Sequence, residues 1–243
     1  MKAAVLPSKE GNVLLILAFE TSAKAASVAL HDGSKLLAES YQNTGLTHSQ
    51  TLMVMAEDML KQCGYTAKDV TAVAVAAGPG SFTGVRIGVA AAKGMAWGLQ
   101  VPCYGVSTLE AMAKNLGIYD GVVCAVMDAR RNQVYNGLFR AEKGAIVRMT
   151  EDRAIALADL GAELVQMDAP VYLVGDGSLV AKAALEDRVI APPEHRMHQR
   201  AAGVAMVAAE QIAAGVVADA EALEPNYLRL SQAEREKLER QSK

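Results

Sequence analysis

The sequence of 243 residues has little cysteine, few aromatic residues and no excess of basic charge. Its three cysteines, Cys63, Cys103 and Cys124, include no Cys-x-x-Cys pair, which argues against a disulfide framework or a zinc knuckle and favours a reducing, cytoplasmic setting. Aromatic residues make up 5% of the chain, which argues against a dedicated base-stacking surface. The formal net charge of −3 argues against a protein that binds nucleic acid on its own.

Long hydrophobic runs are also absent. The densest one, residues 13–19, is much shorter than the roughly 20 residues that a membrane-spanning helix needs, so we expect no membrane association. Pro7, Lys9 and Glu10 interrupt the N-terminal stretch, which argues against a signal peptide, and we expect residues 1–12 to be a disordered leader. Because 51% of the residues are hydrophobic and 21% are charged, we expect a soluble globular chain with enough residues for two small lobes.

Hydrophobic periodicity divides the chain into two similar halves. In the first half we expect strands at residues 13–20, 25–31, 35–41, 70–77 and 101–106, and helices at 48–63, 85–99 and 107–115. In the second half we expect strands at residues 122–128, 133–140, 145–150 and 171–174, and helices at 155–166, 178–185 and 200–214. Ser107 is expected to cap its helix, with Glu110 at the capping-box position.

The order β-β-β-α-β-α therefore occurs twice, which indicates an internal duplication of structure. Two such units facing each other across a cleft are typical of the actin-like (ribonuclease H-like) α/β architecture with mixed sheets. We expect an N-terminal lobe at residues 13–106, a C-terminal lobe at 107–225 and a tail at 226–243, the last part of which is charged and forms a surface helix or a frayed end.

The most distinctive local feature is a glycine-rich loop, residues 78–84, between an apolar strand and a helix. Backbone N–H groups and a helix N-terminus can hold an anion there, with Gly78, Gly80 and Ser81 as candidates. The loop matches neither the P-loop nor the Rossmann fingerprint, since Val85 and Thr83 stand where those patterns need lysine and glycine. The alternative is a tight turn that lets the helix pack closely on the strand.

Two turns offer further candidates. Glu20, Thr21 and Ser22 follow the first strand, where an acid and two hydroxyl groups can hold magnesium or phosphate, or can bond only to their own backbone. Arg130 and Arg131 follow the first strand of the second half, where they can meet phosphate or a partner's acids, or form a solvated turn. We expect at most weak binding of ATP or ADP, at Glu20, Thr21, Ser22, Gly78, Gly80 and Ser81, and no required cofactor.

The histidines and the hydroxyl side chains do not complete a catalytic or metal-binding set. A helical metal pair requires a second ligand four residues after His48, and that position is Leu52. His195 and His198 are three residues apart, but no cysteine or acidic cluster accompanies them. There is no nucleophile elbow of the Gly-x-Ser-x-Gly kind. We therefore predict no catalytic residue and no metal ligand in this chain.

Helices 48–63 and 85–99 are more apolar than a free surface helix. The second carries charge only at Arg86 and Lys93, and the first has three methionines, a residue type that suits adaptable binding surfaces. Either both helices are buried inside the fold or together they form a protein-binding face. The candidate interface residues are Leu52, Met53, Met55, Ala56, Met59, Leu60, Arg86, Val89, Ala90, Lys93 and Trp97.

Several segments occur in an order that resembles one known family, the TsaB (formerly YeaZ) proteins. They are ILAFETS and SVAL (16–30), THSQ (47–50), residues 76–99 around GPGSFTGVRIG, GVSTLEAMA (105–113), DARRNQVY (128–135) and P-x-YLR (225–229). TsaB proteins are required for the threonylcarbamoyl modification of tRNA adenosine 37 (t6A). The resemblance is densest over residues 13–135, and over 141–224 it lies mainly in the architecture.

The resemblance implies a non-catalytic subunit that pairs with TsaD, the threonylcarbamoyl-transferring enzyme, through helices 48–63 and 84–99. It also implies self-association through the same surface when TsaD is absent, the ATPase TsaE as a third member, and tRNA held only by the assembly. TsaD-like sequences carry an acidic pair where this chain reads Ala23-Lys24-Ala25, and a His-x-x-x-His pair where it reads His48 and Leu52. Glu20 departs from the aspartate that is usual in TsaB proteins.

Two other functions compete with this one. The predicted fold and the glycine loop also suit an ATP-dependent phosphotransferase, although the only candidate for an adenosine loop is residues 175–177. A peptidase is the third hypothesis, because TsaB and TsaD sequences are also grouped as M22 glycoproteases. It is the weakest, since the sequence offers neither a metal site nor an activated nucleophile.

Overall fold

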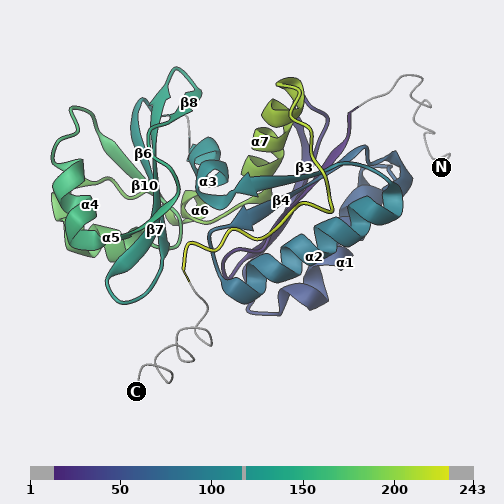
Figure 1. The fold of residues 1–243 in the computed structure, drawn as a ribbon, viewed down its shortest axis with the longest axis horizontal. Helices are drawn as coiled ribbons and strands as arrows, with labels where there is room; N and C mark the ends of the chain where they lie inside the picture. Colours follow the sequence, from purple (N-terminus) through teal and green to yellow (C-terminus); the bar gives the residue numbers. More distant parts are fainter. Residues whose placement is uncertain (1–13, 117–118, 230–243) are drawn as a thin grey trace, which may run out of the picture.

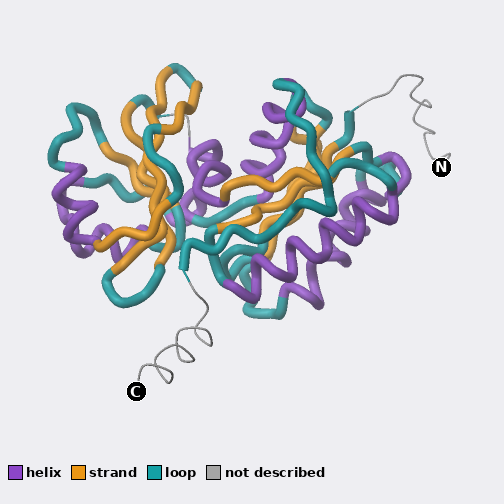
Figure 2. Tube along the Cα trace, in the orientation of Figure 1, coloured by secondary structure: helices purple, strands orange, loops and turns teal. Residues whose placement is uncertain are grey.

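The computed structural model describes residues 14–116 and 119–229, which form two lobes side by side (Figure 1). The expected leader at residues 1–12 and the tail beyond residue 229 lie outside the described residues. Each lobe is built on one β-sheet, and helices lie on both faces of each sheet (Figure 2). Within the described residues no helix has the length and apolar character needed to cross a lipid bilayer.

The first lobe contains a five-stranded mixed sheet in the order β3-β2-β1-β4-β5. Its strands are β1 (Ile16–Glu20), β2 (Ala26–His31), β3 (Leu36–Gln42), β4 (Ala72–Gly78) and β5 (Cys103–Ser107). Strand β2 is antiparallel to both β1 and β3, whereas β1, β4 and β5 run parallel to one another. The helices of this part are α1 (His48–Gln62), η1 (Ala67–Asp69), α2 (Phe82–Leu99) and α3 (Thr108–Leu116).

The second lobe repeats this topology. Its sheet has the order β10-β6-β7-β8, and β9 also pairs with β7. The strands are β6 (Gly121–Asp128), β7 (Gln133–Glu142), β8 (Ala145–Arg148), β9 (Arg153–Ala156) and β10 (Val171–Val174). The helices are α4 (Leu157–Leu164), α5 (Ser178–Leu185), η2 (Glu186–Arg188), α6 (Glu194–Met197) and α7 (Ala201–Ala213).

Strands β6, β7, β8 and β10 have the order and directions of β1, β2, β3 and β4. A parallel bridge between Tyr172 and Ile190 lies where β5 adjoins β4 in the first sheet. The predicted duplication and the predicted two-lobed α/β fold are therefore confirmed.

Alternation of side chains along β1 assigns the two faces of the first sheet to different helices. Leu17 and Phe19 point towards α1 and α2, and Ile16 and Ala18 point towards α7. The α7 side of this sheet is lined largely by alanine, which lets a helix rich in alanine approach closely. In the second lobe α4 and α5 cover one face and α3 covers the other, so α3 and α7 pack against each other between the two sheets (Figure 1).

Helix α7 therefore completes the core of the first sheet although it comes from the C-terminal part of the chain. Sequence periodicity shows which face of a helix is apolar but not which sheet it covers. The division into lobes at residues 13–106 and 107–225 stays a prediction, and the packing adds residues 201–213 to the body of the first lobe.

Most element boundaries differ from the prediction by one to three residues, and each of the larger differences has a local cause. Helix α2 begins at Phe82 instead of Val85, because Ser81 Oγ accepts the Gly84 N–H and caps the helix. Residues 155–156, predicted as helix, belong to strand β9, because their backbone pairs with β7. Helix α4 starts directly after them.

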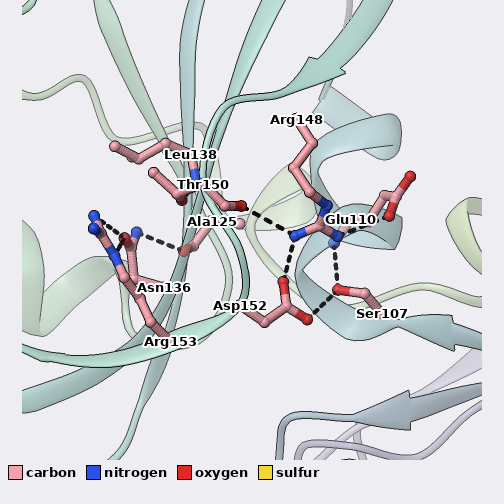
Figure 3. A network of polar contacts seen from close by, with 9 residues as sticks. All are labelled: Ser107, Glu110, Ala125, Asn136, Leu138, Arg148, Thr150, Asp152 and Arg153. Atoms are coloured by element: carbon pink, nitrogen blue, oxygen red, sulfur yellow. Dashed lines mark hydrogen bonds and ion pairs between the residues drawn. The ribbon is translucent and has the colours of Figure 1, made fainter.

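A polar network fixes the start of α3 to the edge of the second sheet (Figure 3). Ser107 Oγ accepts the Glu110 N–H at 3.2 Å, as predicted for a cap, and donates to Asp152 Oδ2 at 2.6 Å. The Glu110 carboxylate does not close a capping box: it binds the Arg148 guanidinium at 2.7 Å. Arg148 also binds Asp152 Oδ1 at 2.6 Å, so one arginine on β8 joins both acids at the junction of the lobes.

Candidate functional site

A cleft of about 670 Å³ lies between the lobes. From the first lobe it is lined by the β1–β2 turn (residues 22–24) and the start of α2 (residues 79–83). From the second lobe it is lined by the β6–β7 turn, Tyr135 and Asp176. Residues 226–229 close one side. The duplicated fold thus places the ends of β1 and β6 at the same opening.

Two acidic residues that interact with each other near the cleft come from different lobes. Glu20 ends β1 and is 1% exposed, and its Oε1 accepts the Ser22 N–H at 2.6 Å. Burial raises the pKa of Glu20 to about 7, and repulsion from Asp176 adds to the rise, while the hydrogen bonds from Ser22 oppose it. Asp176 follows β10 and accepts the Gln199 Nε2–H at 2.9 Å, and burial raises its pKa as well. The two side chains therefore make the base of the cleft unfavourable for an anion.

Stability should fall as the pH rises from about 4.5 to 7, because folding raises the pKa of Glu20 from 4.5 to about 7. In that window the folded chain binds more protons than the unfolded chain, so deprotonation favours unfolding. In the wild type, the titration of Glu20 should lower the free energy of unfolding by on the order of 3 kcal/mol between pH 5 and 8. We expect this part of the pH dependence to be absent in Glu20→Gln. Urea denaturation at several pH values measures this difference.

Asp32→Asn is the control for that series. Asp32 is a partly exposed turn residue whose hydrogen bonds to Ser34 lower its pKa to about 2, so it does not titrate in the same window. Its replacement should leave the slope between pH 5 and 8 unchanged. Equal slopes for wild type and Glu20→Gln would contradict the pKa assigned to Glu20.

The glycine loop packs tightly on the β1–β2 turn. A Cβ at Gly80 would lie 2.6 Å from Ser22 O, one at Gly84 would lie 2.1 Å from Thr21 O, and one at Gly88 would lie 2.3 Å from Thr21 Oγ1. The turn also donates to and accepts from α2: Thr21 Oγ1 donates to Gly84 O at 2.8 Å, and the Ser81 N–H donates to Ser22 O at 2.7 Å. Close packing of helix on turn therefore accounts for these glycines, and the predicted phosphate or nucleotide site there stays a prediction.

His48 is placed by α1 beside the same turn. Its Nε2 lies 2.9 Å from Ala23 O, and Leu52, four residues later, is 1% exposed in the core below α1. His198 lies 3.4 Å from Glu194 on a separate segment. Among residues 14–116 and 119–229, no three His, Cys, Asp or Glu side chains are grouped so that they could hold a metal ion.

The predicted interface residues separate into buried and exposed sets. Six of them are at most 5% exposed and pack between the two helices and the first sheet: Leu52, Met55, Ala56, Met59, Leu60 and Val89. In the free chain these six side chains are covered by its own core, so an interface is proposed below only from the exposed members of the set. Met53 at 45% and Trp97 at 78% are exposed, and Ala90 is exposed as well.

Arg86 and Lys93 bind a segment that the sequence analysis did not identify as part of the site. Residues 220–229, here called the C-terminal strap, run beside α2 between the lobes (Figure 1). Lys93 Nζ donates to Glu221 O at 3.0 Å and Leu223 O at 2.9 Å. Arg86 Nε donates to the Tyr227 hydroxyl at 2.8 Å. Both charges of α2 are therefore used within the chain.

The strap continues from α2 to the second lobe. Tyr227 stacks on Phe82 with ring centroids 4.5 Å apart, and the Arg86 guanidinium lies over the Phe82 ring at 3.9 Å. Arg229 then donates to Ala129 O in the β6–β7 turn. The only sequence signal for this role is the P-x-YLR segment, whose partners are about 100 to 150 residues away in the chain.

Beside Arg86 and Lys93, the exposed surface of α2 consists of uncharged residues. Ile87, Ala90, Gly94 and Trp97, spaced three or four residues apart, lie on one side of the helix and are called here the outer face of α2. Trp97 is 78% exposed, and a Cβ at Gly94 or Gly98 would meet nothing within 4 Å. Small residues on a helix let another helix approach closely. This face, beside the exposed Met53 of the adjacent α1, is therefore suited to packing against another protein.

Residues 41–237 match the family described as TsaD: tRNA N6-adenosine threonylcarbamoyltransferase. The tRNA threonylcarbamoyladenosine biosynthesis protein TsaB of Bacillus subtilis is 34% identical over 94% of this chain and 100% of its own length. The Escherichia coli protein of the same name is 32% identical over 88% of this chain and 94% of its own. The solved structure of YeaZ from Pseudomonas aeruginosa is similar, with a TM-score of 0.76 and 29% identity over 88% of this chain and 100% of that one.

Proposed function

The chain belongs to the TsaB (YeaZ) family of tRNA threonylcarbamoyladenosine biosynthesis proteins, and on that premise we propose that it is a non-catalytic subunit that pairs with TsaD. TsaD transfers the threonylcarbamoyl group, and this chain supports it without supplying catalytic residues. TsaE is the proposed third member of the assembly, which holds tRNA as a whole. The role places the protein in the cytoplasm.

One observation carries this proposal: the uncharged outer face of α2. An exposed helix face normally carries charged side chains, but the two charged residues of α2 bind the strap instead. Removing this face from water buries the large Trp97 side chain together with alanine and glycine, none of which carries a charge that must be desolvated. The match of the chain to the TsaD family supports a related partner of the same fold, because duplicated proteins often pair through equivalent faces.

The candidate metal-binding histidine and the candidate anion-binding loop give the proposal further support. His48 lacks a second ligand at Leu52, and its Nε2 contacts a backbone oxygen. In the glycine loop, the N–H groups of Ser81 and Gly84 are already used within the protein. These contacts argue against an ATP-dependent phosphotransferase, which calorimetry with ATP and Mg²⁺ would reveal through binding tighter than millimolar. No cofactor is proposed for this subunit.

Light scattering after size exclusion tests the pairing directly. We expect this protein alone to form a homodimer through the outer face of α2 and to form a 1:1 complex when TsaD from the same source is added. The two complexes should exclude each other, because they use the same surface. A monomer that ignores TsaD would overturn the proposed function.

A further inference from the structure

Three basic side chains line the cleft and a fourth lies next to one of them in the chain, although the chain as a whole is acidic; these four residues are called here the rim. Lys24 comes from the β1–β2 turn, Arg130 and Arg131 come from the β6–β7 turn, and Arg229 comes from the C-terminal strap. Lys24, Arg130 and Arg229 line the cleft, and Arg131 adjoins Arg130 in the same turn. The internal duplication brings the two turns together, because each follows the first strand of its lobe.

Three of these cations are free to bind a ligand. Lys24, Arg130 and Arg131 are exposed, and within residues 14–116 and 119–229 their side chains make no hydrogen bond and no ion pair. Elsewhere the basic side chains of the lobe junction are paired, as Arg148 is with Glu110 and Asp152. The rim is therefore a local excess of unpaired positive charge.

The β6–β7 turn holds its two arginines in an uncommon backbone conformation. Arg130, Arg131 and Asn132 have φ values of 62°, 57° and 57°, in the left-handed region that non-glycine residues rarely adopt in succession. Asp128 Oδ1 accepts the Arg130 N–H at 2.7 Å, and the Ala129 N–H donates to Gln133 O at 3.0 Å. These bonds maintain the turn, which fixes the backbone from which the two exposed arginine side chains extend.

The charges at the base of the cleft determine what kind of anion suits the rim. Asp176 lines the same cleft, Glu20 is buried close enough to interact with Asp176, and the exposed Asp128 lies beside the arginines. A small phosphate that entered the cleft would approach these acids. An extended polyanion lying across the opening would contact the cations and stay away from the base.

We propose that this rim binds the sugar–phosphate backbone of RNA when the chain is assembled with TsaD. The proposal rests on the proposed function, because a chain of net charge −3 does not hold RNA alone. Lysine and arginine contacts to phosphates carry no sequence information, so the rim should orient tRNA in the assembly without reading its bases.

The test compares two triple variants in the reconstituted complex with TsaD. Lys24→Ala, Arg130→Ala and Arg131→Ala together remove the free cations of the rim. Lys35→Ala, Lys68→Ala and Arg140→Ala together remove three exposed cations elsewhere and form the control. Fluorescence anisotropy with a labelled tRNA transcript is measured at several salt concentrations, and light scattering confirms that each variant still pairs with TsaD.

We expect the rim variant to bind tRNA about 10-fold more weakly near 0.1 M salt, with a dependence of log affinity on log salt that is shallower by about 2. The control should behave as wild type. Unchanged affinity and slope in an intact complex would overturn the rim proposal and leave the pairing with TsaD standing. Loss of pairing in the rim variant alone would also overturn it, because the cations would then contact acidic groups of the partner protein. Failure of the wild type to pair would contradict the proposed function instead.

Discussion

Replacing Ala90 with glutamate should weaken the association with TsaD at least 100-fold while leaving the folded chain as stable as the wild type. Ala90 lies in the middle of the outer face of α2 and is exposed in the free chain, so the new carboxylate stays hydrated there. In the complex it would be removed from water, and Arg86 and Lys93, one helical turn away on either side, already donate to the strap, so the carboxylate would have to compete with those bonds for a partner. An unpaired buried charge costs several kcal/mol, which corresponds to this loss of affinity.

Light scattering and titration calorimetry measure that loss, and the same substitution should convert the homodimer to a monomer. Ala162→Glu is the matched control, because Ala162 is an exposed alanine on α4 of the other lobe. Met55→Glu is not a useful variant, because Met55 is 5% exposed and a charge there would unfold the chain. Pairing that survives Ala90→Glu and Trp97→Ala would place the interface on another surface.

Replacing Gly84 with alanine should lower the free energy of unfolding by about 3 kcal/mol. The new Cβ would lie 2.1 Å from Thr21 O, a backbone atom that cannot move without shifting the β1–β2 turn. The hydrogen bond from Thr21 Oγ1 to Gly84 O and that from the Ser81 N–H to Ser22 O would be strained together. Helix α2 would have to move away from the first sheet, against which Val85 and Val89 pack.

Gly98→Ala provides the control on the same helix. A Cβ at Gly98 meets nothing within 4 Å, so only the helix propensity changes, and we expect stability to rise by up to about 1 kcal/mol. Urea denaturation of the two variants separates the effect of packing from that of propensity. If Gly84→Ala were as stable as the wild type, the glycine of this loop would not be required for packing, and an anion-binding role for the loop would regain support.

The fold was predictable because its signals are local. Apolar runs and helical spacings can be read over ten or fifteen residues, and they predicted the order of elements in both halves. The duplication followed from that order alone. The errors lie where a distant strand decides the structure, as at residues 155–156, whose backbone pairs with β7. No local pattern distinguishes a short edge strand from the first turn of a helix.

The sequence by itself determined the family, the two-lobed architecture and the two apolar helices that matter for binding. Motifs and hydrophobic periodicity depend only on residues that are close together in the chain, so the sequence shows them directly. Only the tertiary structure decided which side of each helix is free. Met55 and Ala90 are both apolar residues on adjacent helices, but Met55 packs on the sheet whereas Ala90 faces solvent. It also brought the P-x-YLR strap to α2 and gathered Lys24, Arg130 and Arg229 at one rim. Such groupings depend on contacts across 100 residues or more, which a linear pattern does not record.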